Sequence, residues 1–522
     1  MKTLTSCLQG AWVSGQGHAQ TLCNPTTEEA IASASTHGLD FKKALSYGRD
    51  VGGKALRALS FAERGTMLKK LADAISAQRE ELLLLGMQNG GNTRSDAKFD
   101  VDGAIATLAY YAELCQSLGN ARFLSDGDAV PLGRSPRLFG QHFLFPRKGI
   151  AIHINAYNFP AWGLAEKAAT CLAAGMPFLC KPATSTALLA HRMFEVMLSS
   201  GALPDGAGQF VCGSVSDLLD HVESADVVAF TGSCETAALL RAHQQIIEKG
   251  VPLNVEADSL NIAVGGPDLE RGTETYDLFL KNVVKEITQK TGQKCTAIRR
   301  IFVKRDKLSE VVEDLLERLS QHKVGAPDLP DVTIGPLATA QQKRDVETGI
   351  AKLAKEARIV LGGVGRLSLH QTDPEKGYFV MPTLLVAHDP SVLKEVHSLE
   401  VFGPVATVIP YENTEHLFAQ AERGQGSLVA SVFSDDRAFL SESVMGLSAS
   451  HGRICLGSEK VAGPFIPPGT VMPQLTHGGP GRAGGGTELG GLRGMLFYMQ
   501  RTAVSGFQPF LESFSATAKR AW

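Results

Sequence analysis

The residue with the strongest chemical signature is Cys295, in the segment Thr291-Gly-Gln-Lys-Cys295-Thr-Ala. It lies among small and polar residues directly after Lys294, which favours a cysteine of lowered pKa whose thiolate is a nucleophile. A single cysteine of this kind is as often structural, so other groups must support the interpretation. Asn158 offers an amide donor and Glu256 a carboxylate. A nucleophile, a base and a donor for an oxyanion are the parts that acyl transfer requires.

The elements that must position these residues alternate after residue 148 between short apolar runs and helical patterns. We expect strands at 149–154, 178–180, 209–212, 227–230 and 253–255, and helices at 162–174, 185–200 and 234–249. This alternation predicts β-α-β units and a parallel sheet covered on both faces, which binds ligands at the carboxyl ends of its strands. The unusual residues each follow an expected strand: Asn158, Lys181, Gly232 with Ser233, and Glu256.

Other stretches predict further elements. Helices are expected at 64–90 and 101–118, a second α/β unit over 283–475 with strands at 300–303, 406–409 and 428–432, and a tail strand at 496–504. Gly479-Pro-Gly481-Arg-Ala-Gly484 fits the G-x-G-x-x-G dinucleotide pattern. Because it follows no convincing strand and opens no β-α-β unit, it predicts only a glycine-rich loop.

Composition excludes several classes of function. The 522 residues are 44% hydrophobic, with a formal charge of -3, so neither a nucleic-acid nor a membrane partner is expected. The first residues lack the apolar core of a signal peptide, which favours a cytoplasmic protein. The nine cysteines and 14 histidines show no C-x-x-C or H-E-x-x-H spacing, so no metal site is expected.

The chain resembles the aldehyde dehydrogenase superfamily over nearly its whole length. Five short motifs occur in the family's order: Asn158-Phe-Pro160 (W-N-F-P, with Tyr157 for tryptophan), Lys181-Pro (K-P), Phe230-Thr-Gly-Ser233 (F-T-G-S), Gly292-Gln-Lys-Cys295 (G-Q-x-C) and Glu400-Val-Phe402-Gly-Pro (E-x-F-G-P). The resemblance implies an α/β fold with a Rossmann-like NADP-binding domain (1–122 and 148–257), an α/β catalytic domain (258–478) and a small β oligomerisation element (123–147 and 495–522) that would form a homodimer.

The resemblance also implies residue roles. Cys295 would be the nucleophile, Glu256 the base that activates the hydrolytic water, and the Asn158 side chain would form an oxyanion hole with the backbone N–H of Cys295. On the cofactor side, Lys181 would hold the adenosine ribose, Gly232 and Ser233 the pyrophosphate at a helix N-terminus, and Glu400 and Phe402 the nicotinamide ribose and ring.

The choice of cofactor is predicted from Thr184. In NAD-preferring relatives a glutamate often stands three residues after the lysine of the K-P pair and accepts the adenosine 2′-hydroxyl. A carboxylate would repel a 2′-phosphate, whereas the hydroxyl of Thr184 leaves space and could donate a hydrogen bond to it. The sequence therefore predicts NADP in preference to NAD.

Departures from the family pattern narrow the range of expected substrates. Glu256-Ala-Asp-Ser-Leu-Asn261 replaces E-L-G-G-K, and a loop starting His477-Gly-Gly-Pro-Gly-Arg482 replaces P-F-G-G. Both resemble a branch with the dehydrogenase half of a phenylacetate ring-opening enzyme and a stand-alone enzyme of aerobic benzoyl-CoA degradation. Since the sequence ends at Trp522 without room for a hydratase domain, the stand-alone enzyme is the closer resemblance, and the expected substrate is a CoA-linked semialdehyde, 3,4-dehydroadipyl-CoA semialdehyde.

Residues 477–488, in and beside the glycine-rich loop, include the candidates for contacts with the substrate. His477 could contact substrate or be structural, Arg482 could meet the charged coenzyme A head or form a loop salt bridge, and glycines 484–486 could line a tunnel. Glu488 could relay protons to Glu256, although a hydrogen-bonded loop anchor is favoured.

Alternative functions remain. Another semialdehyde of phenylacetate degradation fits the same branch. An enzyme that passes its acyl group to coenzyme A is disfavoured by Glu256, because such enzymes generally lack that glutamate. A non-catalytic protein on this scaffold is disfavoured by the intact set of Cys295, Glu256, Asn158 and Lys181.

Overall fold

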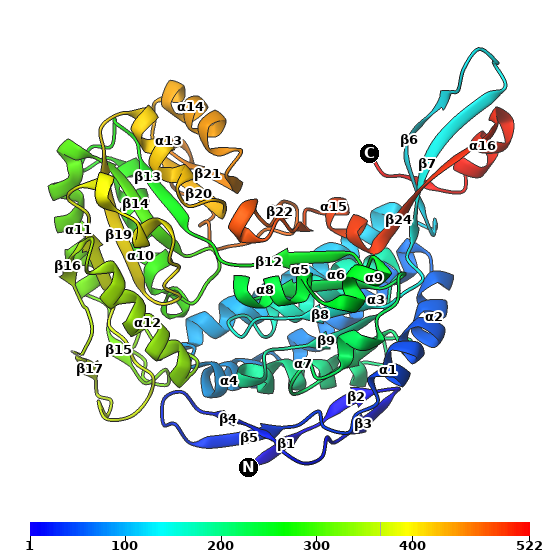
Figure 1. Cartoon of the computed structure of the whole chain (residues 1–522), viewed down its shortest axis with the longest axis horizontal. Coiled ribbons are helices and arrows are strands. Elements are labelled where there is room, and N and C mark those ends of the chain that lie inside the picture. The colour runs from blue at the N-terminus through cyan, green and yellow to red at the C-terminus, as the bar shows by residue number, and fades with distance from the viewer. Residues whose placement is uncertain (366) are drawn as a thin grey trace.

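Two large sheets flanked by helices form the body of the molecule, and a smaller sheet projects from it (Figure 1). The computed structural model describes residues 1–365 and 367–522. The first seven-stranded sheet has the order β12-β11-β8-β9-β10-β2-β3 and the second β16-β18-β19-β14-β13-β20-β21. Most neighbouring strands run parallel, so the predicted α/β fold is confirmed.

The first sheet contains the strands predicted after residue 148. They are β8 (Ala151–Ile154), β9 (Phe178–Lys181), β10 (Gly208–Phe210), β11 (Val227–Thr231) and β12 (Leu253–Glu256), extended by β2 (Ser6–Leu8) and β3 (Ala11–Val13). Helices α6 (Trp162–Ala174) and α7 (Ala187–Ser199) connect them. The helix predicted at 234–249 is two helices, α8 (Cys234–Arg241) and α9 (Gln244–Lys249), because His243 takes an extended conformation between them.

Both faces of this sheet are buried, as the apolar strands predict. In β8, Ala151 packs into the core formed with α3 and α5–α7, whereas Ile152 and Ile154 pack into the core on the opposite face. His153 is buried and stacks on Phe178 with ring centroids 5.6 Å apart. His153 is therefore a packed core histidine.

The helices before the sheet position α6. The single helix predicted at 64–90 is interrupted at Gln78 into α3 (Phe61–Ala77) and α4 (Arg79–Gly90), followed by α5 (Arg94–Leu118). Asp100 of α5 accepts hydrogen bonds from the backbone N–H groups of Ala161 (3.3 Å) and Trp162 (2.8 Å). Because these N–H groups have no partner within α6, Asp100 fixes where that helix begins.

The second sheet carries the nucleophile loop and the E-x-F-G-P segment. Its strands are β13 (Asn261–Gly265), β14 (Ile298–Lys304), β16 (Arg358–Leu361), β18 (Thr383–Val386), β19 (Val405–Tyr411), β20 (Ser427–Phe433) and β21 (His451–Gly457). The main helices beside it are α10 (Glu274–Thr288), α11 (Leu308–Ser320) and α12 (Ala340–Leu353). The strands predicted at 300–303, 406–409 and 428–432 are confirmed within β14, β19 and β20.

A four-stranded sheet with the order β24-β7-β6-β25 forms an arm that projects from the body, at the upper right of Figure 1. They are β6 (Leu124–Pro131), β7 (Leu138–Pro146), β24 (Met499–Phe507) and β25 (Lys519–Arg520), with α16 (Gln508–Ser515) beside them. The tail strand predicted to start at 496 starts at 499, because residues 496–498 form a 3-10 turn. Among the described residues, no helix combines the length and hydrophobicity that crossing a bilayer requires.

A two-stranded hairpin base lies between the two large sheets. β22 (Thr476–His477) pairs antiparallel with β23 (Glu488–Leu489), so that His477 is opposite Glu488. The intervening residues form an irregular loop with one 3-10 turn over Gly481–Ala483. The prediction that the G-x-G-x-x-G match is a glycine-rich loop is therefore confirmed.

Candidate active site

The carboxyl edge of the first sheet gathers the predicted site residues. Thr231 is in register with Glu256, and Ile154 with Lys181, so these strands end side by side. A cleft of about 720 Å³ opens at this edge, lined by Lys181, Gly232, Ser233 and Glu256 from the first sheet and by Glu400 and Phe402 from the second. Cys295 and Asn158 also line the cleft, so the structure brings the predicted nucleophile and oxyanion donor to its inner end.

The loop that carries Cys295 has an unusual backbone. Lys290, Thr291 and Gly292 have φ values of 54°, 55° and 66°, so three consecutive residues occupy the left-handed region. This conformation is costly for side chains other than glycine, and above all for a β-branched threonine. Asp96 accepts the Lys290 N–H at 2.9 Å, and the Thr291 hydroxyl donates to the Gly335 carbonyl at 2.9 Å. These buried hydrogen bonds hold the turn that delivers Cys295.

Arg299 and Asn261 hold the other side of the loop. Arg299 donates to the carbonyls of Gly292 (2.9 Å) and Gly403 (2.6 Å). The Asn261 amide donates to the Cys295 carbonyl at 2.7 Å. With its carbonyl held on that side, the backbone at Cys295 is rigid, as a preorganised oxyanion donor requires.

Lys294 does not activate the neighbouring thiol. Its ammonium is fully buried and donates to Glu286 at 2.7 Å and to Gln289 at 3.0 Å. Burial first, and then the Glu256 carboxylate, holds the pKa of the Cys295 thiol well above its usual value. The prediction that Lys294 lowers the pKa of the thiol is therefore wrong. The two side chains are adjacent in sequence, but that of Lys294 points to Glu286 and not to the sulfur.

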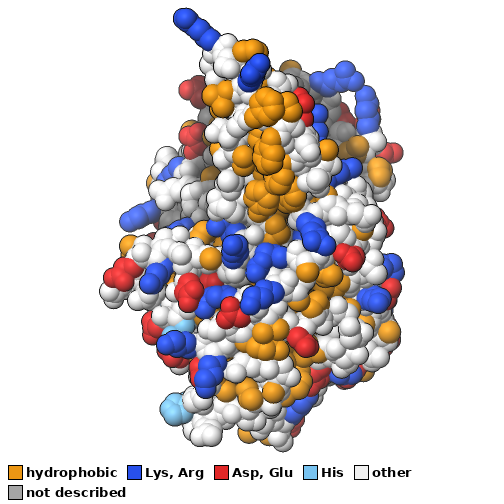
Figure 2. Space-filling view, turned by 90° about the vertical axis from the view of Figure 1, so that its right-hand side faces the viewer, with side chains coloured by type: hydrophobic (Ala, Val, Ile, Leu, Met, Phe, Trp, Pro, Cys, Tyr) orange, Lys and Arg blue, Asp and Glu red, His pale blue; other side chains and the backbone are white. Residues whose placement is uncertain are grey.

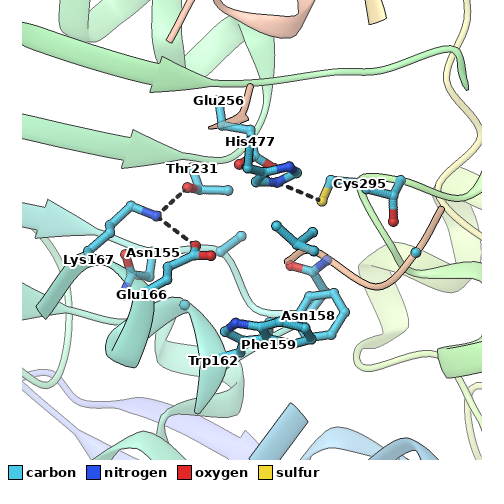
Figure 3. A pocket seen from close by; sticks show the side chains of 15 residues that line it. Asn155, Asn158, Phe159, Trp162, Glu166, Lys167, Thr231, Glu256, Cys295 and His477 are labelled. Carbon is cyan, nitrogen blue, oxygen red and sulfur yellow. Dashed lines mark hydrogen bonds and ion pairs between the residues drawn. The ribbon is translucent and has the colours of Figure 1, made fainter. Parts of the chain in front are cut away.

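Glu256, His477 and Cys295 form a compact trio. The Nε2 atom of His477 lies 3.1 Å from Oε2 of Glu256 and 3.9 Å from the Cys295 sulfur, and Figure 3 shows the ring beside both. Glu256 and His477 are 3% and 4% exposed, which places a charged pair out of contact with bulk water. The side-chain Oε, Nε2 and Sγ atoms of the three residues all lie within 4.8 Å of one another.

Glu256 and His477 shift each other's pKa values in opposite directions. Burial alone would raise the pKa of Glu256, but the neighbouring imidazole of His477, with Lys167 and the thiol, lowers it to about 2. Burial alone would lower the pKa of His477, but the Glu256 carboxylate raises it. Both shifts favour the ionised pair, a carboxylate beside an imidazolium.

Asn158 lies next to the nucleophile loop. Its amide nitrogen donates to the Gln293 carbonyl at 3.0 Å and lines a small inner cavity of about 40 Å³ together with Cys295, Glu256 and His477. An amide NH₂ has two hydrogens, so one remains for an oxygen bound near the sulfur. This is the placement that the oxyanion-hole prediction needs.

Lys167 is a site residue that sequence reasoning missed. Its ammonium is 1% exposed and contacts Glu166 (3.3 Å), Glu488 (3.2 Å) and the Thr231 hydroxyl (2.8 Å). Burial raises the pKa of Glu166 to about 8. The available signal was a lysine on helix α6, most of whose other residues are apolar, since a buried lysine needs partners. Glu488 also accepts from Asn254 at 3.3 Å, so it does anchor the hairpin base.

The cofactor side of the cleft has groups that fit a nucleotide. Burial raises the pKa of Glu400 to about 8, and its Oε1 atom is buried without a hydrogen-bond partner within the described residues. The Lys181 ammonium lines the cleft, and burial lowers its pKa. Phe402 packs edge-on against Tyr157 and presents the ring that the resemblance assigns to the nicotinamide pocket.

The N-terminus of α8 differs from expectation. Ser233 caps the helix by accepting the Thr236 N–H at 3.3 Å. The carboxylate of Asp258 accepts the Cys234 N–H at 3.0 Å and its S–H at 3.1 Å. An anion of the chain therefore already uses the first free N–H of the helix, where a pyrophosphate was expected.

Thr184 is not available as a phosphate donor. It is buried, and its hydroxyl donates to the Gly213 carbonyl at 3.0 Å. A hydroxyl has one hydrogen, so it cannot also donate to a 2′-phosphate. The predicted hydrogen bond from Thr184 to a 2′-phosphate is therefore wrong. The prediction of NADP now rests, at this position, only on the absence of a carboxylate.

Arg482 and the glycine run lie away from the inner cavity beside Asn158. Arg482 lines the cofactor cleft, donates to the Ser398 carbonyl at 2.6 Å and has a buried Nε atom without a partner within the described residues. Gly484 and Gly486 pack against the Val255 carbonyl of β12, where a Cβ atom would come within 2.3 Å of the oxygen. The structure therefore contradicts both expectations: a contact between Arg482 and coenzyme A at the substrate entrance, and a tunnel lined by glycines.

Comparison with known proteins shows the class to which this fold and site belong. The model of the aldehyde dehydrogenase family matches residues 12–504. The chain belongs to that family and is an NAD(P)-dependent aldehyde oxidoreductase.

Individual relatives show which branch of the family the chain resembles. The chain is 45% identical to 3,4-dehydroadipyl-CoA semialdehyde dehydrogenase of Aromatoleum evansii, over 91% of its length and 93% of that protein. It is 29% identical to retinal dehydrogenase 2 of Mus musculus, over 81% and 78% of the two chains. Betaine aldehyde dehydrogenase of Staphylococcus aureus, solved with NAD⁺, has the same fold with a TM-score of 0.83 at 24% identity, over 97% and 95% of the two chains. These matches confirm the predicted branch and fold.

The buried Lys294–Glu286 pair yields a test. Lys294→Met should lower the free energy of unfolding by about 3–5 kcal/mol, because it leaves a carboxylate buried without its cation. Adding Glu286→Gln should recover most of that loss, since an amide oxygen still accepts the Gly469 N–H that Glu286 accepts at 3.2 Å. Denaturant unfolding measures both. The pH midpoint of Cys295 alkylation should match wild type in the double variant, and an upward shift of about one unit would mean that Lys294 does activate the thiol.

Proposed function

We propose that this protein oxidises a CoA-linked semialdehyde, 3,4-dehydroadipyl-CoA semialdehyde, to the carboxylic acid with NADP, in aerobic benzoyl-CoA degradation. The substrate is proposed from the name of the relative that is 45% identical over 91% of the chain. The observation that carries the chemistry is the position of Cys295, whose side chain lines both the cofactor cleft and the inner cavity beside it.

The residues support a thioester mechanism. The Cys295 thiolate attacks the aldehyde carbon, and the Asn158 amide with the Cys295 N–H stabilises the oxyanion that forms. Bound NADP would accept the hydride when the tetrahedral adduct collapses to a thioester. Glu256, a buried carboxylate beside the sulfur, then takes a proton from the water that cleaves the thioester. The same carboxylate disfavours transfer of the acyl group to free coenzyme A.

Lys167, Glu166 and Glu488 form the proposed route for that proton. The three side chains are in mutual reach around the Lys167 ammonium, and Thr231 is in register with Glu256. Glu488 does not contact Glu256, so any relay between them passes through Lys167 and its neighbours. Glu488 anchors the hairpin base, the role favoured from the sequence, and we propose that it also takes part in this relay.

Glu256→Gln should stall deacylation and slow acylation to a smaller extent. A stoichiometric burst of reduced cofactor should then appear with a steady-state rate reduced by about 10²–10⁴-fold, the usual contribution of a general base. Cys295→Ala should abolish both burst and turnover, to below about one per cent of wild type, while cofactor binding is retained. Stopped-flow absorbance measures these phases. An equal loss of burst and steady state in Glu256→Gln would assign Glu256 to thiol activation instead.

The proposed preference for NADP rests on the adenosine end of the cleft. Lys181 contributes a positive charge there, and the neighbouring wall residues Ala183 and Val215 are uncharged. A 2′-phosphate bound there would lie near the Lys181 ammonium, and residue 184 would place no carboxylate beside it. Further along the cleft, Glu400 and Arg482 each have a buried polar atom without a hydrogen-bond partner among the described residues, and these atoms fit hydrogen bonding to the rest of a nucleotide.

Cofactor kinetics test this preference. Wild type should have the higher kcat/KM with NADP, and Thr184→Glu should shift the ratio toward NAD by about tenfold or more, because a carboxylate repels the 2′-phosphate. Thr184→Gln is the matched control, with nearly the same shape and no charge. A wild-type preference for NAD, or an equal shift in both variants, would contradict the argument.

A second, outer cavity provides the proposed substrate channel. It has a volume of about 480 Å³ and shares Trp162 and Val471 with the inner cavity beside Cys295. Phe99, Phe159 and Trp162 pack edge-to-face at the junction, and Figure 3 shows Phe159 and Trp162 below the reacting sulfur. An aromatic wall suits an apolar acyl chain. The exposed Lys98 at the outer cavity replaces Arg482 as the proposed contact for the coenzyme A phosphates.

Substrate competition tests the channel. The CoA-linked semialdehyde should have a higher kcat/KM than hexanal, and Lys98→Ala should raise KM for the CoA substrate severalfold without affecting hexanal, because only the charged head reaches Lys98. Lys42→Ala, at an exposed lysine of a distant helix, is the control. If hexanal is the better wild-type substrate, the CoA proposal is wrong and the aldehyde dehydrogenase assignment stands.

The arm supports a proposed homodimer. Large hydrophobic side chains are exposed on it, at Val130, Leu138, Phe507 and Phe510. Figure 2 shows hydrophobic side chains gathered in a band on the upper part of this face. β24 is an edge strand, with β7 as its neighbour in the sheet. Exposed edges and apolar patches are normally covered, and a second copy of the chain would cover these. The division into cofactor, catalytic and oligomerisation units likewise stays a prediction.

A further inference from the structure

The trio of Glu256, His477 and Cys295 contains a group that the proposed mechanism does not use. His477 contacts both the proposed base and the reacting sulfur, at 3.1 Å and 3.9 Å. A nitrogen and an oxygen at 3.1 Å must share a proton, since two lone pairs facing each other would repel. Lys167 lies near Glu256 as a further cation, which favours the carboxylate form and leaves the shared proton on the imidazole.

Other charges around His477 agree with this assignment. Glu166 of α6 faces the ring and favours its protonation, whereas Arg453 of β21 opposes it. Burial is the largest single effect and lowers the pKa of His477, but Glu256 and Glu166 together outweigh burial and Arg453, so the pKa is raised. The imidazolium therefore persists above the usual imidazole pKa, and it is lost only as pH rises through the raised value.

We propose that His477 is a catalytic residue whose imidazolium pairs with Glu256 in the resting enzyme and with the Cys295 thiolate during attack. The proposal rests on the thioester chemistry proposed above. It adds a cation to a centre whose nucleophile contacts no other positively charged group among the described residues, since Lys294 is bound to Glu286.

The proton balance of the step is simple. The S–H bond of Cys295 breaks and an O–H bond forms on Glu256, so a thiol and a carboxylate become a thiolate and a carboxylic acid. The Nε2–H of His477 is unchanged and turns its hydrogen bond from the carboxyl to the sulfur. The centre carries one positive and one negative charge before and after. No unpaired charge is created out of water, where it would be costly.

The fold fixes His477 where this step needs it. β22 holds His477 opposite Glu488, which is anchored in turn by Lys167 and Asn254. Behind it, a Cβ atom at Gly452 of β21 would come within 1.7 Å of the Gly478 carbonyl, so the two segments touch through backbone alone. The ring therefore has little freedom to leave the sulfur.

Two substitutions separate charge from packing. His477→Gln removes the cation and keeps a polar side chain, whereas His477→Phe keeps the ring volume and removes both charge and hydrogen bonding. In both variants the pH midpoint of Cys295 alkylation by iodoacetamide should rise by about one unit or more, and the burst of reduced cofactor near neutral pH should slow about tenfold or more. Cofactor affinity and the KM for aldehyde should change little.

The outcomes are distinguishable. If either folded variant keeps the wild-type alkylation midpoint and burst rate, His477 is only a packing residue and the proposal is wrong. If His477→Phe behaves like wild type but His477→Gln does not, ring shape and not charge is responsible, which also overturns it. Cys295→Ala identifies the alkylated sulfur. Turnover retained in that variant would remove the thioester mechanism itself, independently of His477.

Discussion

The active site depends on one backbone constraint, the left-handed turn that precedes Cys295. Each non-glycine residue in this region costs about 1–3 kcal/mol unless its surroundings enforce it. Asp96, Gly335 and Arg299 supply that enforcement from three separate parts of the chain. A turn so held fixes the sulfur at the meeting point of the two large sheets. The packing of α5, of the loop at Gly335 and of β14 around this turn is therefore what keeps the nucleophile in place.

Buried charge is the second constraint. Glu256, His477, Lys167 and Glu488 are all nearly inaccessible to water, yet each has an oppositely charged neighbour. Low dielectric strengthens these pairs and makes an unpaired member costly. A centre of this kind can move a proton over short distances without a large change in solvation. The aromatic cavity on one side and the polar cleft on the other then give the two reactants separate approaches.

Much of the fold was predictable because its strands have a simple signature. Fully buried parallel strands appear as short apolar runs between helical patterns, and the positions predicted for β8, β9, β11 and β12 agree with the structure within a few residues. Helix breaks were not predictable. Gln78 and His243 interrupt helices at positions without glycine or proline, so no local signal marked them.

By itself, the sequence determined the types of reacting group and the sheet edge at which they lie, because motif order and strand periodicity are local properties. Only the tertiary structure decided the direction of each side chain. Lys294 turns to Glu286 and the Thr184 hydroxyl to Gly213, although their neighbours in sequence line the site. The contact between His477 and Cys295 joins residues 182 positions apart. It exists because a two-residue strand pair closes beside the sulfur, a long-range packing event that no local pattern encodes.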